Sequence, residues 1–306
     1  MDFKCQVCST ETGSFSALHR HIKKEHGLIP RDYYPLFFPR FDLFDGEPIE
    51  FKDIKQYGST SFNNKYNFLK WISLSSKEVQ DYSINILKER AEDKGINLIP
   101  SHVELKSLFA PNLNDYISMF KGVDGFKSIL EESGLKMKLE PVKPEFKTGL
   151  MKIFVDTREQ TPLNFGEESQ VKKLIVGDYC PSEEFFSNLF VERKSLYDLA
   201  GTLTSGLDRF KREIERAAEL GLYLVVVTES SFVDAFDYSP KNSFSQRIGG
   251  AYLFNRIRLL MKDYNNIQFV FAPNRFRSVE MIESIFRMRE AARTTDLEWC
   301  KDRQII

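Results

Sequence analysis

From residue 151 to about residue 295, short apolar segments alternate with amphipathic ones, and this alternation restricts the fold more than any other feature. Apolar runs occur at residues 153–155, 189–191, 224–227 and 269–271 (IFV, LFV, LVVV and FVF). Three segments show helical spacing of apolar residues instead: GLDRFKREIERAAEL (206–220), FSQRIGGAYLFNRIRLLMKDY (244–264) and SVEMIESIFRMREAAR (278–293). Buried strands that alternate with helices predict an α/β domain with a partly parallel sheet.

We expect a further strand over residues 171–179, VKKLIVGDY, and it carries the first candidate site residue. Asp178 lies at the end of this strand, and Glu192 and Lys194 end the strand NLFVERK. Because side chains alternate between the faces of a strand, Glu192 and Lys194 share one face and Arg193 points to the other. If the two strands are neighbours, two carboxylates and an ammonium group meet. Such a group suits a Mg²⁺ ion that shares its ligands with a phosphate and an attacking water.

A longer set of motifs supports this interpretation. VDTREQTPL (155–163), VGDY, VERKSLYDL, DRFKREIERA and LVVVTE follow one another. In this order they resemble the XPF-type structure-specific nuclease domain of the PD-(D/E)xK superfamily, over roughly residues 151–295. The resemblance implies a mixed sheet flanked by helices and a DNA endonuclease that depends on Mg²⁺ or Mn²⁺. It assigns these residues to the catalytic site: Asp156, Arg158, Glu159, Asp178, Glu192, Arg193, Lys194 and Asp198.

Within this set, the resemblance implies that Asp178 and Glu192 hold the metal ion and that Lys194 acts at the water. Glu159 and Asp198 would support the site, and Arg209 would either contact a phosphate or brace the site. Other roles stay open for three members. Asp156 could cap a strand end, Arg158 could form an ion pair inside the site, and Asp198 could stabilise a helix N-terminus. The helix-hairpin-helix module that usually follows such a domain is not found in the sequence after residue 295, which leaves the preferred DNA structure open.

The N-terminus carries a second chemical motif. Cys5, Cys8, His21 and His26 have the spacing C-x2-C-x12-H-x4-H, which is typical of a Cys2His2 zinc finger. We expect a structural zinc site over residues 1–30, with SFSALHRHIKKEH as its helix. His19 is an alternative ligand. Arg20, Lys23 and Lys24 are expected to contact DNA, although a structural or protein-binding finger remains an alternative.

The region between the finger and the nuclease domain has three parts. Residues 31–72 form an aromatic-rich connecting region, and residues 139–150 carry two prolines and are expected to be a linker. Residues 73–138 are expected to be helical. Within them, SHVELKSLF, NLNDYISMF and DGFKSILEESGL resemble the helical repeat that accompanies homing endonucleases of phages and bacteria. This repeat implies a helix-turn-helix-like DNA-binding module, and plain helix packing is the alternative.

Composition limits the remaining functional classes. The chain has 306 residues, a formal net charge of −1 and only four Cys residues. Bulk charge therefore does not indicate a nucleic-acid binder, and any such surface must be local. With no recognisable signal peptide and no long apolar run, we expect a soluble cytoplasmic protein.

The favoured hypothesis is a metal-dependent DNA endonuclease of phage or mobile-element origin, with N-terminal modules that target it to DNA. One alternative is a structure-specific nuclease for forks, flaps or junctions. Another is a catalytically inactive DNA-binding protein. The resemblance also implies a homodimer that pairs through an apolar helix face, and IGGAYLFNRIRLLM (248–261) is the candidate segment for it.

Overall fold

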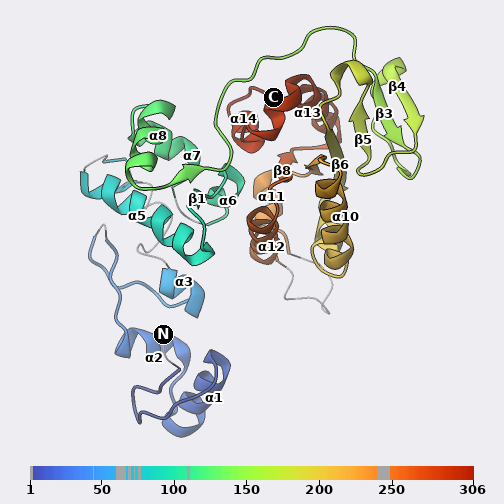
Figure 1. Cartoon of the computed structure of the whole chain (residues 1–306). Coiled ribbons are helices and arrows are strands. Elements are labelled where there is room, and N and C mark those ends of the chain that lie inside the picture. Colours follow the sequence, from blue (N-terminus) through green and yellow to red (C-terminus); the bar gives the residue numbers. More distant parts are fainter. Residues whose placement is uncertain are drawn as a thin grey trace. The chain divides into compact units, whose positions relative to one another are not determined.

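The computed structural model describes residues 3–43, 45–59, 67, 70–71, 73–74, 77–108, 111–239 and 249–306. The chain divides into two compact units, Met1–Val79 and Gln80–Ile306 (Figure 1). Each unit has its own core, and each is described separately.

The first unit contains the predicted finger helix and two short helices. α1 (Phe15–His26) begins after Ser14, whose Oγ accepts a hydrogen bond from the Ala17 N–H at 3.2 Å. α2 (Pro30–Phe37) and α3 (Ile54–Ser59) follow. One core joins the finger to the aromatic-rich segment, and its members are Cys5, Leu18, Ile22, Tyr33, Tyr34, Ile49, Phe51 and Tyr57. The finger therefore shares its core with residues 33–57 instead of folding around its own few apolar side chains.

The helical region that follows matches the sequence pattern. Its helices are α5 (Lys77–Lys94), α6 (His102–Lys106), α7 (Leu113–Met119) and α8 (Val123–Glu132). Capping boxes at Ser101 and Asn112 satisfy free N–H groups where α6 and α7 begin. A small parallel pair, β1 (Leu98–Ile99) and β2 (Lys136–Met137), was not expected from the sequence. Phe109, the last residue of the segment SHVELKSLF, lies outside the described residues.

A six-stranded mixed sheet forms the centre of the second unit. Its strands are β3 (Ile153–Asp156), β4 (Ser169–Lys172), β5 (Tyr179–Pro181), β6 (Leu189–Ser195), β7 (Tyr223–Glu229) and β8 (Ile267–Ala272), in the spatial order β4-β3-β5-β6-β7-β8. β5 runs antiparallel to both of its neighbours, and the other pairs are parallel. The expected fold class, a mixed sheet flanked by helices, is confirmed.

Helices cover both faces of this sheet (Figure 1). α9 (Leu196–Thr202), α10 (Leu207–Glu219), α11 (Phe232–Phe236) and α12 (Gly250–Asp263) pack with the face that carries Phe190 of β6 and Leu224 of β7. α13 (Arg275–Met288) and α14 (Leu297–Asp302) cover the face that carries Leu189 and Val225. Short 3-10 helices lie at Gly166–Glu168, Glu183–Phe185 and Arg289–Arg293. Even-numbered and odd-numbered residues of β6 therefore face different sets of helices.

The prediction of one strand over residues 171–179 is wrong. β4 ends at Lys172, residues 173–178 are irregular, and β5 begins only at Tyr179. The apolar run that suggested a strand instead buries Leu174 and Val176 from a loop. The long helix expected over 244–264 begins, in the described residues, at Gly250; residues 240–248 lie outside them.

The helical region packs against the part of the same unit that contains the sheet. The segment between β2 and β3 contains no helix or strand, and Figure 1 shows it as an extended connection. Lys138 donates hydrogen bonds to the carbonyl oxygens of Met261 and Tyr264, which end α12. Glu140 forms an isolated parallel bridge with Thr295. These contacts hold the segment between β2 and β3 against the rest of the unit.

A buried charged cluster joins α6 to α14. Lys106 Nζ lies 2.9 Å from Glu298 Oε1 and 2.6 Å from Asp302 Oδ2, and His102 Nε2 lies 2.9 Å from the same Asp302 oxygen. Glu298 also accepts from Lys301 at 2.5 Å. Since Glu298 and His102 are almost fully buried, these partners are needed to offset desolvation.

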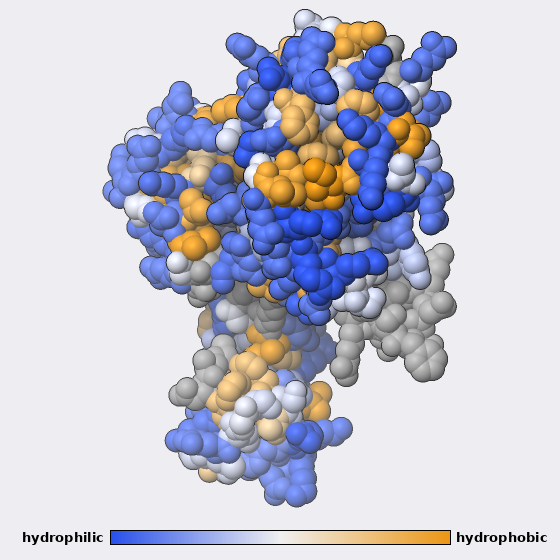
Figure 2. Space-filling view, turned by 45° about the vertical axis from the view of Figure 1, so that its right-hand side comes forward, coloured by the Kyte–Doolittle hydropathy of each residue, from blue (hydrophilic) through white to orange (hydrophobic). Residues whose placement is uncertain are grey.

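Among the described residues, no helix combines the length and the apolar character that a membrane crossing requires. Figure 2 shows apolar residues at the surface as separate patches among hydrophilic ones.

Candidate active site

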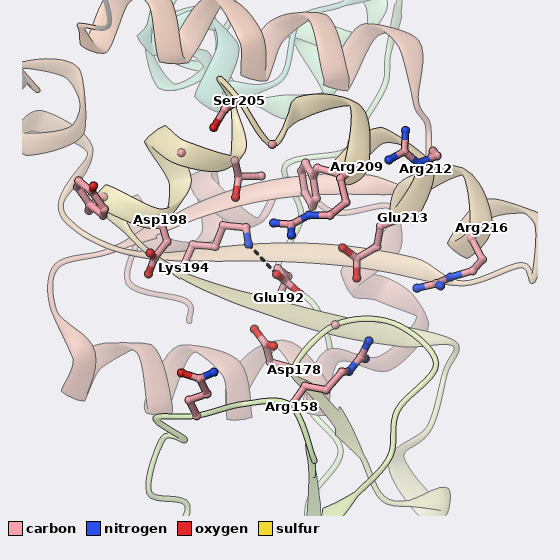
Figure 3. A pocket seen from close by; sticks show the side chains of 17 residues that line it. Arg158, Asp178, Glu192, Lys194, Asp198, Ser205, Arg209, Arg212, Glu213 and Arg216 are labelled. Carbon is pink, nitrogen blue, oxygen red and sulfur yellow. Dashed lines mark hydrogen bonds and ion pairs between the residues drawn. The ribbon is translucent and has the colours of Figure 1, made fainter. Parts of the chain in front are cut away.

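A cavity of about 1140 Å³ lies between the sheet and the helices α9 and α10 (Figure 3). Its lining is charged on several sides. The lining residues are Arg158, Gln160, Gly177, Asp178, Glu192, Lys194, Tyr197, Asp198, Gly201, Thr202, Ser205, Gly206, Arg209, Phe210, Arg212, Glu213 and Arg216. It thus gathers five of the eight predicted catalytic residues together with Arg209.

Asp178 reaches the cavity from the loop that precedes β5, not from the end of a strand. Gly177 makes this possible, since its φ is +66° and an added Cβ would lie 2.9 Å from the Val191 carbonyl oxygen. The Asp178 N–H donates to that same carbonyl at 2.8 Å, and the Arg193 N–H donates to Asp178 Oδ2 at 2.8 Å. Because β5 is antiparallel to β6, the start of β5 lies beside the second half of β6, where Glu192 stands.

Glu192 and Lys194 point to the same face of β6, as the period of two predicts. Lys194 Nζ donates to Glu192 Oε1 at 2.7 Å and lies 5.6 Å from the centre of the Phe210 ring. Figure 3 shows both side chains facing Asp178 across the cavity floor. The sheet therefore brings two carboxylates and one ammonium group to a single place.

Burial and neighbouring negative charges raise the pKa of both carboxylates. Desolvation, followed by the charge of Glu192, raises the pKa of Asp178 to about 8. Desolvation also raises the pKa of Glu192, against the opposing effect of Lys194. The single positive charge of one ammonium group does not balance the negative charges of two such carboxylates. Their oxygens are the ligands that hard divalent cations prefer, so the donor set fits a Mg²⁺ or Mn²⁺ ion.

Arg193 points to the opposite face, as expected, and lies outside the cavity lining. Its guanidinium pairs with Glu159 at 3.1 Å and with Glu229 at 3.2 Å. Glu229 also pairs with Arg275 at 3.1 Å. Glu159 thus belongs to an ion network beneath the site, and this geometry favours a supporting position for it.

Asp156 is buried and also lies outside the lining. Its carboxylate accepts from the Arg158 N–H at 2.8 Å, from Arg158 Nε at 2.6 Å and from the Leu174 N–H at 2.6 Å. Burial alone would raise the pKa of Asp156, but these hydrogen bonds outweigh it and lower the pKa. Asp156 therefore organises the loops that follow β3 and β4, and it holds Arg158 at the cavity.

Asp198 both lines the cavity and caps a helix. Ser195 Oγ donates to Asp198 Oδ2 at 2.7 Å and accepts from the Asp198 N–H at 3.1 Å, where α9 begins. Both roles considered from the sequence are therefore compatible with its position.

Three charged residues of the cavity are not predicted from the sequence: Arg212, Glu213 and Arg216. All three lie on α10, three to seven residues after Arg209. The charge of Glu213 contributes to the raised pKa of Glu192, so its carboxylate is a third acid at the site. The available signal was helical spacing, because positions i+3, i+4 and i+7 share a face with Arg209.

In the first unit, the four predicted zinc ligands come together. Ligand atoms of Cys5, Cys8, His21 and His26 all lie within 4.8 Å of one another. Cys8 Sγ is 3.2 Å from His21 Nε2 and 3.3 Å from His26 Nε2. Two sulfur and two imidazole donors at this separation fit a closed tetrahedral zinc site.

His19, the alternative ligand, instead lies 3.0 Å from the Tyr34 hydroxyl. Arg20, Lys23 and Lys24 are exposed on α1, where Arg20 Nε donates to the Ser16 carbonyl at 3.4 Å and Lys24 pairs with Glu25 at 3.0 Å.

Comparisons with known proteins agree with the predicted family in the C-terminal part. The ERCC4 domain family matches residues 155–285. Two solved structures are similar. "XPF from Aeropyrum pernix" has a TM-score of 0.34 and 23% identity and covers 46% of this chain and 60% of its own. "XPF from Aeropyrum pernix, complex with DNA" has a TM-score of 0.33 and 22% identity and covers 44% of this chain and 62% of its own.

The chain thus spans about 60% of the length of these two structures. No curated protein matches it. Residues 155–285 are therefore similar to the ERCC4 domain family.

Proposed function

We propose that this protein is a DNA endonuclease that hydrolyses phosphodiester bonds with a divalent metal ion. The observation that carries the proposal is the meeting of Asp178, Glu192 and Lys194 in one cavity within an ERCC4 domain. Two acids and one ammonium group at a polar cavity suit phosphoryl chemistry, which depends mainly on positioning and charge compensation.

Asp178 and Glu192 would hold a Mg²⁺ or Mn²⁺ ion through their carboxylate oxygens. When bound, the ion polarises the phosphate and lowers the pKa of a bound water. Lys194, fixed by Glu192 and by the ring of Phe210, would hydrogen-bond the attacking water or the developing charge. Arg158 and Arg209 would bind the phosphate from opposite walls, and Glu213 would complete the acidic group. By family resemblance, the products would carry a 5′-phosphate and a 3′-hydroxyl.

The N-terminal parts are proposed to direct the enzyme to DNA. Zinc at the four-residue cluster would fix α1, which exposes Arg20, Lys23 and Lys24. The helical region would add contacts of the helix-turn-helix kind. An origin in a phage or mobile element follows only from the resemblance of α6–α8 to the homing-endonuclease repeat, and it stays a prediction.

A homodimer through the nuclease domain also stays a proposal. The apolar residues of α12 that suggested it are buried within their own unit: Leu253, Phe254, Ile257, Leu260 and Met261. A pairing surface on this helix would have to use exposed positions such as Leu259. Sedimentation of the purified chain as a strict monomer over a wide concentration range would reject the dimer.

The decisive variant is Glu192→Gln, which removes a metal ligand and almost no surface. We expect cutting of plasmid DNA with Mg²⁺ to fall at least about 100-fold, in the range of losses seen when a group that stabilises the transition state is removed. DNA affinity should stay within about twofold. Full activity of this variant would refute the assigned site.

The substrate is the next question, because sequence-directed and branch-directed cutting remain the two candidates. A panel of linear duplexes, flaps, forks and four-way junctions separates them. Selective cutting at mapped positions of a phage or genomic DNA library supports the first. Selective cutting of branched members supports the second. Tight binding with no cutting of any member would identify an inactive DNA-binding protein.

A further inference from the structure

Tyr197 has no visible structural reason for its position. It is 79% exposed, the highest value among the large hydrophobic side chains of the described residues. It lines the catalytic cavity from the first turn of α9. In the part of the chain that the structure describes, its hydroxyl makes no hydrogen bond and its ring stacks on no other ring. A ring without a partner among the described residues thus lines the same cavity as the carboxylates and the arginines.

The other end of the cavity is cationic. In Figure 3, Asp198 and Arg216 lie at opposite ends of the labelled residues, with Glu192 and Glu213 between them. Tyr197 is next to Asp198 in the sequence and belongs to the same turn. Arg212 and Arg216 lie one helical turn apart on α10. The carboxylates therefore lie between an aromatic end and an arginine end.

The arginines have free donors. Arg216 Nη2 donates to the Ile175 carbonyl at 3.1 Å, which holds the guanidinium across the loop that carries Asp178. Within the described ranges, neither Arg209 nor Arg212 forms an ion pair or a hydrogen bond through its side chain. Unpaired guanidinium groups on one wall of a polar cavity are suited to phosphate oxygens.

We propose that this cavity is a track for one nucleic-acid strand, with an unpaired nucleobase stacked on Tyr197 and backbone phosphates bound by Arg212 and Arg216. The inference rests on the proposed function, because the scissile phosphate is taken to lie at Asp178 and Glu192. It adds to that function a base-binding subsite and a substrate feature, namely an unpaired nucleotide on the Tyr197 side of the cut.

The unpaired state follows from the physics of stacking. In a continuous duplex, each base has both faces covered by its neighbours, so a protein ring gains no base face. An unpaired base offers a free face, and stacking on an aromatic ring favours its binding with little sequence preference. The arginines recognise the backbone, which is also independent of sequence. The track therefore selects strand structure and not base identity.

Binding of oligonucleotides tests the stacking subsite, in a Glu192→Gln background so that no substrate is cut. Tyr197→Leu should weaken the binding of a single-stranded oligonucleotide about 5- to 150-fold, while Tyr197→Phe should retain it within about twofold. Phe276→Leu is the matched control, because Phe276 is 70% exposed on α13 outside the cavity lining. Fully paired duplex should bind all variants alike.

A fluorescent base reports contact directly. An oligonucleotide with one 2-aminopurine in its unpaired arm should be quenched by the parent and by Tyr197→Phe, and not by Tyr197→Leu. Equal quenching by Tyr197→Leu, or an equal loss of duplex and single-strand binding in that variant, overturns the stacking subsite.

Salt dependence tests the phosphate end. Arg212→Ala and Arg216→Ala should each reduce the slope of log affinity against log salt by about 0.7 for single-stranded DNA. Lys211→Ala, on the same helix but outside the cavity lining, removes the same charge and should leave the slope unchanged. If Lys211→Ala and the two arginine variants give the same slope, the arginine track is refuted.

These readouts separate the inference from the function on which it rests. If the protein with Glu192 intact cuts no DNA, the proposed function fails, and the binding data still decide the track. If the protein cuts DNA and Tyr197→Leu binds and cuts flaps and forks as the parent does, the track alone fails.

Discussion

Asp178 combines burial with a nearby like charge, and this combination has a measurable effect on stability. Its pKa in the folded protein is about 8, against about 3.9 in an unfolded chain. Between these values the folded state binds more protons than the unfolded state, so stability falls as the pH rises from about 4 to about 8. A divalent cation at Asp178 and Glu192 would remove this penalty.

We therefore expect Asp178→Asn to raise the Tm at pH 8 without divalent ions. The rise should be about 2–4 °C for each kcal/mol of folding stability that the substitution restores. At pH 4 the substitution should have little effect on the Tm. Added Mg²⁺ should raise the Tm of the parent at pH 8 but not that of the variant. Thermal unfolding at both pH values, with and without Mg²⁺, measures this. An identical Mg²⁺ response in the two proteins would show that Asp178 is not a ligand.

Glu213 shows what residue-level prediction missed and why. The period of a strand placed Glu192 and Lys194 on one face and Arg193 on the other, and the structure has this arrangement. Glu213 reaches the cavity from α10, which follows β6 and α9 in the chain. Only its spacing of four residues from Arg209 could have indicated it.

Glu213→Gln should lower the cutting rate by about 10- to 100-fold, the range typical of groups that support metal ligands. Glu219→Gln, on an exposed part of the same helix and outside the cavity lining, is the control and should leave the rate unchanged. The comparison uses cleavage rates at saturating DNA. Equal rates for the two variants would remove Glu213 from the site.

At the scale of elements, long periodic segments were predictable and the loop that carries Asp178 was not. β6, β7, β8 and α10 agree closely with the sequence pattern because their apolar faces are regular. The apolar residues within 173–178 have another role: Leu174 and Val176 anchor a loop in the core. Composition alone cannot distinguish a buried loop from a buried strand, and Gly177 was the only local sign of a turn.

Gly177→Ala tests this loop. The variant requires a left-handed backbone with a side chain, and its Cβ would meet the Val191 carbonyl at 2.9 Å. Gly221→Ala shares the left-handed backbone, at φ +67°, but its Cβ has no neighbour within 4 Å. We expect Gly221→Ala to lower the free energy of unfolding by about 1–2 kcal/mol. Gly177→Ala should lower it by clearly more. Urea unfolding of both variants gives the difference, and equal losses would contradict the steric account.

At the scale of the molecule, the two compact units predict separate responses to metal removal. Cys5 lies in the core that also holds Tyr33 and Tyr34. A chelator that strips zinc should therefore release residues 30–37 along with the finger, while β6 and β7 stay protected. Hydrogen exchange with and without chelator measures both regions, and Cys8→Ser should reproduce the chelated pattern. Protection of residues 30–37 that survives full loss of zinc would argue against a shared metal-dependent core.

The charged cluster between α6 and α14 has a geometric consequence. Ion pairs of His102 and Lys106 with Asp302 link the helical region to α14. The connection after it contacts Tyr264 through Lys138 and Thr295 through Glu140. If α6–α8 bind DNA as proposed, the distance along the DNA between the bound segment and the scissile bond is constant. Mapped ends would then cluster at a single spacing, without the scatter that a loose tether produces.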